Sequence, residues 1–218
     1  MKALITGASS GLGREMARLL AARGYELILC ARREERLREL AAELPVPCRI
    51  IAADVSDEQE CRLLYEAVQS EELEVVINNA GFGLFGEFVT ADLDEELRMI
   101  DTNVKGLLYI THEVAPLMIK NEKGHIVNIA SVAGKEVYPG GNVYCATKHA
   151  VDALSKAMRI DMLKHNIKVT NIAPGMVETE FSVVRYKGDQ QAADNVYKGV
   201  TPLTGEDIAD TIVFAAVS

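Results

Sequence analysis

The stretch Thr6-Gly7-Ala8-Ser9-Ser10-Gly11-Leu12-Gly13 follows directly on a short apolar run and opens a helical pattern. Glycines at such a strand-to-helix turn let backbone amides approach a pyrophosphate at the positive end of the helix. The spacing is G-x-x-x-G-x-G, with one more residue in the turn than the usual G-x-G-x-x-G. A plain glycine turn is the alternative. The strand-turn-helix setting favours a dinucleotide site, formed by Gly7, Ser9, Ser10, Gly11, Leu12 and Gly13.

Short apolar runs alternate with longer amphipathic stretches along the rest of the chain. The runs are too apolar to have one face exposed to water. This is typical of parallel strands that are buried on both faces. Right-handed crossovers between them give an α/β fold with a doubly wound parallel sheet and helices on both faces. The expected strands are Lys2–Thr6, Glu26–Cys30, Arg49–Ala53, Val75–Asn78, His125–Ala130 and Lys168–Ala173, and the two longest helices are about Leu93–Asn121 and Asn142–His165.

The length of 218 residues indicates one domain, residues 1–218. The segment 174–205 is rich in glycine and proline, so we expect a long loop with room for one short helix, placed as a lid over the substrate. The last stretch, Glu206–Val217, has a helical pattern. An alternating chain would follow it with another strand, so either the sheet ends at six strands or the chain is trimmed.

Composition excludes several classes of protein. The net charge of −9 argues against a general nucleic-acid binder, because affinity for a phosphate backbone needs clustered cations. No apolar run approaches the roughly 18 residues of a membrane span. The N-terminus leaves no room for a signal segment, so a cytoplasmic location is expected. The four cysteines and four histidines form no metal signature, and we predict no metal.

The end of the second expected strand bears on the choice of cofactor. A site for NAD usually has an acidic residue there, whereas this chain has Arg32 and Arg33. Arginine forks suit a 2′-phosphate, so Arg32, helped by Arg33 or Arg14, argues for NADP. The alternative is a solvated helix start in which these arginines pair with nearby glutamates. At the end of the third strand, Asp54-Val55 is placed for an adenine edge; the alternative is a helix cap by Asp54 or Ser56.

The run Tyr144-Cys145-Ala146-Thr147-Lys148 carries an acid/base pattern. On a helix, Tyr144 and Lys148 are i and i+4 neighbours on one face. A positive charge close to a phenol favours the phenolate, which would make Tyr144 a usable general base. Tyrosine and lysine at this spacing also occur on many solvated helix faces, so the pair needs support from the rest of the chain.

Taken together, these motifs resemble the short-chain dehydrogenases/reductases, whose fold is a Rossmann-type sheet. The further matches, in family order, are Asn78-Asn79-Ala80-Gly81, Asn103, Ser131 and Pro174-Gly175. The resemblance implies that Asn103, Ser131, Tyr144 and Lys148 are catalytic: Ser131 holds the substrate oxygen, Tyr144 moves its proton, Lys148 binds the nicotinamide ribose and lowers the tyrosine pKa, and Asn103 places a water in the proton relay. It also implies that the cofactor contacts Asn79, Ala80, Gly81, Tyr144, Lys148, Pro174, Gly175, Val177 and Thr179.

The stretch from Ile172 to Tyr186 is similar to the branch of NADP-dependent 3-hydroxy acid dehydrogenases that act on serine, allo-threonine and 3-hydroxypropionate. Arg185, in the expected loop, could clamp a substrate carboxylate through two parallel hydrogen bonds. The alternative is a surface arginine paired with Glu178 or Glu180. The resemblance also implies a homodimer or homotetramer, and a strand after the last helix that this sequence lacks. Competing functions are reduction of another carbonyl, such as a 3-oxoacyl thioester or small ketone, and non-catalytic NADP binding.

Overall fold

The computed structural model describes residues 1–217, and its centre is a parallel sheet of six strands in the order β3-β2-β1-β4-β5-β6. Leu4 in β1 lies opposite Ile28 on one side and Val76 on the other. The chain reverses its direction of winding between β1 and β4, where doubly wound sheets bind their ligands. The strands are β1 (Lys2–Thr6), β2 (Glu26–Ala31), β3 (Cys48–Ala52), β4 (Val75–Asn78), β5 (Gly124–Ile129) and β6 (Ile167–Ile172), each within one residue of its predicted bounds.

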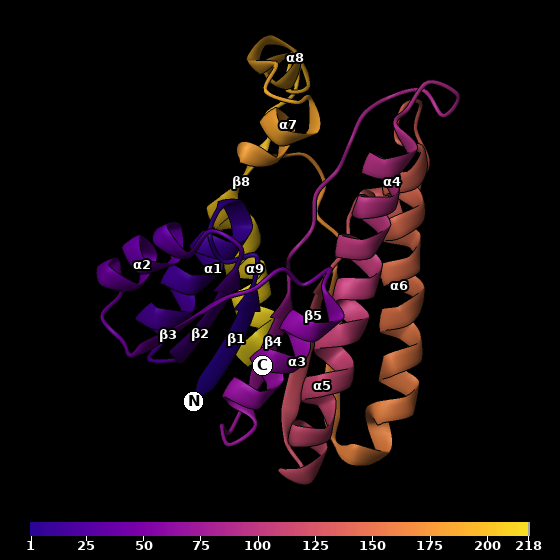
Figure 1. Ribbon diagram of the computed structural model, residues 1–218. Helices are drawn as coiled ribbons and strands as arrows, with labels where there is room; N and C mark the ends of the chain where they lie inside the picture. Colours follow the sequence, from indigo (N-terminus) through magenta and orange to yellow (C-terminus); the bar gives the residue numbers. More distant parts are fainter. Residues whose placement is uncertain (218) are drawn as a thin grey trace.

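Alternate residues of the strands serve two separate apolar cores. Ala3 and Ile5 pack with helices α1, α2 and α9, whereas Leu4 and Val76 pack with α3, α5 and α6. Both faces of the sheet are therefore buried, which explains the apolar strand sequences. Figure 1 shows helices on both sides of the sheet. Their bounds are α1 (Gly11–Ala22), α2 (Glu34–Glu43), α3 (Glu58–Val68), α4 (Leu93–Ile100), α5 (Gly106–Lys120), α6 (Asn142–Met162) and α9 (Gly205–Val217).

The two longest predicted helices are confirmed, with one unexpected feature. Helix α4 passes into α5 through a π-helical segment, Asp101–Lys105, which holds Asn103. A π-helical turn accommodates one more residue than an α-helical turn and often marks a functional site. Helix α6 continues into a single 3-10 turn, Leu163–His165, and ends at Asn166 in the left-handed conformation.

The segment 174–205 has more structure than the predicted loop with one short helix. It contains two short helices, α7 (Glu180–Arg185) and α8 (Gln190–Asn195), and a two-stranded parallel sheet of β7 (Val177–Glu178) and β8 (Leu203–Thr204). Both helices lie beyond the carboxyl ends of the central strands (Figure 1). Six-residue helices are too short to produce apolar periodicity, which is why the sequence did not reveal both. None of the described helices is long and apolar enough to cross a membrane.

Candidate functional site

The carboxyl ends of the strands open into an elongated cleft of about 630 Å³. This volume lies within the usual range for small-molecule sites. The cleft brings together nearly all of the residues predicted from the sequence: Gly7, Ser9, Ser10, Gly11, Leu12, Arg32, Arg33, Asp54, Val55, Asn79, Ala80, Gly81, Ser131, Tyr144, Lys148, Pro174, Gly175, Val177, Thr179 and Arg185. Of the predicted residues, Gly13, Asn103 and the possible helper Arg14 do not line it.

The glycine-rich turn is fixed to the end of β4. Gly7 has a φ of +67°, and a Cβ there would lie 2.9 Å from the Ala80 Cα. The Asn79 side-chain amide donates to the Thr6 and Gly7 carbonyls (3.0 and 3.3 Å). A Cβ on Gly13 would lie 2.2 Å from the Gly7 carbonyl oxygen, so Gly13 allows the tight turn and does not face the cleft. Asn79 and Gly13 thus both hold the turn in its tight conformation.

The N-terminus of α1 is suited to an anion. Its N-cap residue, Ser10, makes no side-chain capping bond, and the first turn has no acidic residue. Amides at such a helix end carry a partial positive charge and lack helical partners. The observed turn therefore fits the pyrophosphate of a dinucleotide.

Arg33 lies closer to this turn than Arg32. Its guanidinium donates to the Ser9 and Ser10 hydroxyls (3.2 and 2.9 Å). Burial, with repulsion from Arg36 and then Arg32, lowers the pKa of Arg33. Arg32 is 73% exposed and lies 3.7 Å from the Asp54 carboxylate. In the structure it is thus Arg33, and not Arg32, that contacts the glycine-rich turn.

The structure also differs from the expectations for Arg14 and for the cap of helix α3. Arg14 forms an ion pair with Glu43 at 2.6 Å, so it does not join Arg32 and Arg33. Asp54 accepts bonds from the Ser56 amide (3.0 Å) and hydroxyl (2.7 Å), and α3 is capped by Asp57 instead of either residue. The sequence Asp57-x-x-Glu60 could have revealed this cap.

Ser131, Tyr144 and Lys148 meet at the centre of the cleft. Tyr144 and Lys148 follow each other by one turn of α6, and both are buried. Ser131 begins the 3-10 turn Val132–Gly134 that follows β5, and its hydroxyl accepts from the Ala133 amide at 3.1 Å. The Lys148 ammonium donates to the Ile129 carbonyl at 2.8 Å and lies 5.8 Å from the centroid of the Tyr144 ring.

The pKa of Tyr144 differs from the one expected from the sequence. Burial raises the pKa of Tyr144 to about 12, and a hydrogen bond with Ser131 acts in the opposite direction. Lys148 is not among the groups that lower this pKa, because its ammonium faces the Ile129 carbonyl. Burial also lowers the pKa of Lys148 to about 8. Desolvation by burial is therefore the largest cause of both pKa shifts.

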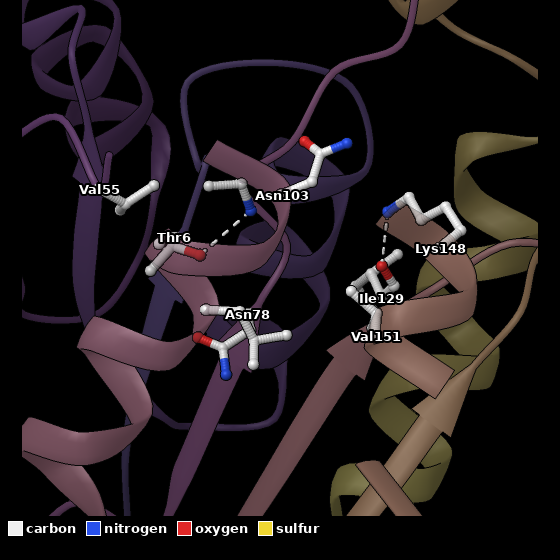
Figure 2. Close-up of a pocket in the computed structure, with 10 residues that line it drawn as sticks. Thr6, Val55, Asn78, Asn103, Ile129, Lys148 and Val151 are labelled. Carbon is white, nitrogen blue, oxygen red and sulfur yellow. Dashed lines mark hydrogen bonds between the residues drawn. The ribbon is translucent and has the colours of Figure 1, made fainter. Parts of the chain in front are cut away.

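Asn103 lies behind the catalytic group, on a small internal cavity. The cavity of about 10 Å³ is also lined by Lys148, Thr6 and Asn78 (Figure 2). That is near the lower limit for a single water. The Asn103 amide donates to the Phe82 carbonyl (2.8 Å) and the Thr147 hydroxyl (3.1 Å), and its oxygen accepts from the Phe82 amide (3.0 Å). Both amide hydrogens are thus already bonded, so a relay water held by this side chain could use only its oxygen.

Arg185 lies among aromatic rings beside Tyr144. Its guanidinium carbon is 5.1 to 5.9 Å from the ring centroids of Phe85, Tyr138, Tyr144 and Tyr186, and it donates to the Tyr138 hydroxyl at 3.0 Å. Its Nε is buried without a hydrogen-bond partner among the described residues. Neither Glu178 nor Glu180 pairs with it; Glu180 pairs with Arg36. The sequence did not single out Phe85, Tyr138 or Tyr186 as neighbours of Arg185, because aromatic residues outside regular periodic elements carry no spacing signal.

The comparisons with known proteins identify the family. A model of the short chain dehydrogenase family matches residues 1–190. The chain belongs to this family. It is an oxidoreductase of the short-chain dehydrogenase/reductase type, as the resemblance implied, and the six-stranded order described above is the Rossmann-type order of that fold.

Among the relatives of this short-chain dehydrogenase, the NADP-dependent 3-hydroxy acid dehydrogenase of Schizosaccharomyces pombe is 43% identical over 97% of this chain and 85% of its own length. Sulfoacetaldehyde reductase 2 of Chromohalobacter salexigens is 44% identical over 98% of this chain and 87% of its own length. A solved structure, the closed form of serine dehydrogenase complexed with NADP+, superposes with a TM-score of 0.96 at 38% identity, covering 100% of this chain and 90% of that one.

Within the described part of this dehydrogenase, no group of three or more histidine, cysteine or acidic residues could hold a metal ion.

Proposed function

We propose that the chain is an NADP-dependent dehydrogenase that interconverts the hydroxyl and carbonyl forms of a small 3-hydroxy acid of the serine, allo-threonine or 3-hydroxypropionate type. The observation that carries this proposal is Arg185. It is a cation beside Tyr144 with no acidic partner among the described residues and with an unpaired, buried Nε. A guanidinium in a low-dielectric site prefers an anionic partner, and the substrate carboxylate would supply it.

The preference for NADP is supported by Arg33 and by the relatives. Arg33 lies over the Ser9 and Ser10 hydroxyls, next to the end of β2 where the 2′-phosphate would be held. The N-terminus of α1 would hold the pyrophosphate, and Asp54 and Val55 would line the adenine end. The chemistry that NADP supplies when bound is hydride transfer at its nicotinamide ring.

The residues of the chain handle the proton and the orientation of the substrate. In reduction the Tyr144 phenol donates its proton to the substrate oxygen, and in oxidation Tyr144, as the phenolate, takes the hydroxyl proton. Ser131 holds the same substrate oxygen by a hydrogen bond, while Arg185 holds the acid group at the other end. Two fixed points on a small substrate leave it little freedom to rotate, which favours reaction at one carbon.

The test is an Arg185→Met variant, assayed with 3-hydroxypropionate and with its uncharged methyl ester. Loss of a charge-assisted bond of about 1.5–3 kcal/mol should raise KM for the acid roughly tenfold to a hundredfold and leave the ester unaffected. Lys187→Met is the matched control, because Lys187 lies two residues away and pairs with Glu95 at the surface. An unchanged KM for the acid in Arg185→Met would refute the clamp.

Sulfoacetaldehyde and its alcohol are the second candidate substrates, because one relative carries that activity in its name and Arg185 could equally hold a sulfonate. Steady-state rates with both sets of compounds, with NADP and NAD, decide between them. A preference for an uncharged ketone or an acyl thioester would instead favour the alternative reductase function. Tyr144→Phe separates all of these from a non-catalytic NADP-binding protein, since turnover should be lost while NADP still binds.

The cytoplasmic location and the assembly as a homodimer or homotetramer stay predictions. So do the individual catalytic and cofactor-binding roles of the site residues; the variants above address those of Tyr144 and Arg185.

A further inference from the structure

Asp152 is a buried carboxylate on the catalytic helix that the proposed mechanism does not use. It lies one turn after Lys148 on α6 and is 8% exposed. Tyr144, Lys148 and Asp152 therefore succeed one another at intervals of four residues on the same face of the helix. A carboxylate at such a position needs partners, because an isolated buried charge is costly.

Three side chains satisfy this carboxylate. Its Oδ1 accepts from the Lys135 ammonium (2.6 Å) and from the Asn171 amide in β6 (2.8 Å). Its Oδ2 lies 2.7 Å from the Lys156 ammonium. The two lysines hold the pKa of Asp152 down to about 2, so the carboxylate is charged at every working pH. Lys156 lies on the same helix, whereas Lys135 and Asn171 come from other parts of the chain.

Lys135 ends the turn that begins with Ser131. Within that turn the Gly134 amide donates to the Ser131 carbonyl (2.8 Å) and the Lys135 amide to the Val132 carbonyl (2.8 Å). Gly134 rests directly on α6, where a Cβ would lie 2.6 Å from the Lys148 carbonyl oxygen. The Ser131 turn is thus attached to the catalytic helix at two levels, by backbone packing at Lys148 and by the Lys135 ion pair at Asp152.

We propose that Asp152 is a positioning residue: through Lys135 it holds the Ser131 turn against α6, so that the Ser131 hydroxyl stays aligned with the Tyr144 phenol. The Asn171 bond adds β6 to the same carboxylate and ties the turn, the helix and the sheet together. This inference rests on the proposed function, in which Ser131 and Tyr144 act on one substrate oxygen. It assigns no chemical step to Asp152 or Lys135.

The test compares Lys135→Met with Lys156→Met. Both remove an exposed lysine paired with Asp152, but only Lys135 links it to the Ser131 turn. A catalytic group displaced by about 1 Å can lose up to roughly a hundredfold in rate, so kcat should fall about ten- to a hundredfold in Lys135→Met. NADP affinity should not change, and Lys156→Met should match the wild type. Asp152→Asn keeps an acceptor oxygen and should lose less kcat than Asp152→Leu.

Two further readouts separate positioning from loss of folded protein. Ser131 opposes the upward shift in the pKa of Tyr144, so the apparent pKa of hydroxy acid oxidation should rise in Lys135→Met but not in Lys156→Met. Hydrogen exchange of the amides from Ser131 to Glu136 should also become faster only in Lys135→Met. Equal kcat, pH profile and exchange in the two lysine variants would overturn the proposal.

A failure of the proposed function gives a different result. If the wild type prefers another carbonyl compound, the same comparison is made with that compound. If the wild type turns nothing over, the enzyme proposal fails, and the exchange rates alone decide whether Lys135 holds the turn.

Discussion

Arg32 and Arg33 are consecutive residues with different surroundings, and only one of them reaches the glycine-rich turn. Arg33 donates to Ser9 and Ser10, while Arg32 is largely in solvent. A solvated guanidinium loses side-chain entropy when it binds a ligand, whereas the Arg33 guanidinium is already held at the glycine-rich turn. We therefore expect Arg33 to carry most of the preference for NADP over NAD.

The corresponding experiment measures Kd for NADP and for NAD in Arg33→Met and Arg32→Met. Arg33→Met should raise Kd for NADP by about tenfold or more, as expected for a lost charge-assisted bond, and leave Kd for NAD unchanged. Arg32→Met should have a smaller effect on NADP. A larger loss of NADP affinity in Arg32→Met would contradict the assignment.

These residues also show what spacing can and cannot predict. The i, i+4 relation placed Tyr144 and Lys148 on one face of a helix, and the structure confirms it. The pKa of Tyr144 was not predictable in this way, because it depends on burial by segments distant in sequence, such as Phe181. The same holds for Arg185, whose aromatic neighbours come from the segments around Phe85, Tyr138 and Tyr186.

Asn103 joins the helix formed by α4, the π-helical segment and α5 to two other segments. That side chain satisfies both backbone groups of Phe82, in the loop after β4, and also binds Thr147 on α6. Asn103 is buried, so its removal leaves several polar groups without partners. It therefore joins three segments of the site besides any role in a proton relay.

Asn103→Ala should lower the free energy of unfolding by about 2–4 kcal/mol, since two or more buried polar groups lose their partners. Thr147→Val keeps both Phe82 bonds; it removes the bond from Asn103 and the bond from the Thr147 hydroxyl to the Tyr144 carbonyl (2.7 Å), and it should cost less than Asn103→Ala. Urea denaturation of both variants measures the difference. Equal losses would mean that the Phe82 bonds contribute little.

Helices and strands were predictable to different degrees for a physical reason. The six strands and the long helices leave clear apolar patterns because each packs against one of two large cores. The π-helical segment leaves no such pattern, since one added residue in a turn does not alter the composition. Helices α7 and α8 are preceded by Thr179 and Asp189, whose side chains cap them, but such caps also occur in plain turns.

Burial of the charged Lys148 lowers the stability of the whole folded molecule. Burial lowers the pKa of this lysine to about 8 from its ordinary 10.5. Below about pH 8 the lysine is charged in both the folded and the unfolded chain, and the folded chain bears the desolvation cost in full. Between about pH 8 and 10.5 the unfolded chain binds more protons, so this contribution favours folding increasingly as pH rises.

Lys148→Met should therefore be more stable relative to the wild type at pH 7 than at pH 10.5. A difference of 2.5 pKa units corresponds to roughly 3 kcal/mol for the change in relative stability over this window. Because Tyr144 and the other titrating groups remain in both proteins, their effects cancel in the comparison. Urea denaturation of the two proteins across the pH range measures it. A constant difference would show that Lys148 keeps its ordinary pKa in the folded enzyme; a decreasing one would show that this active site is maintained at the expense of stability.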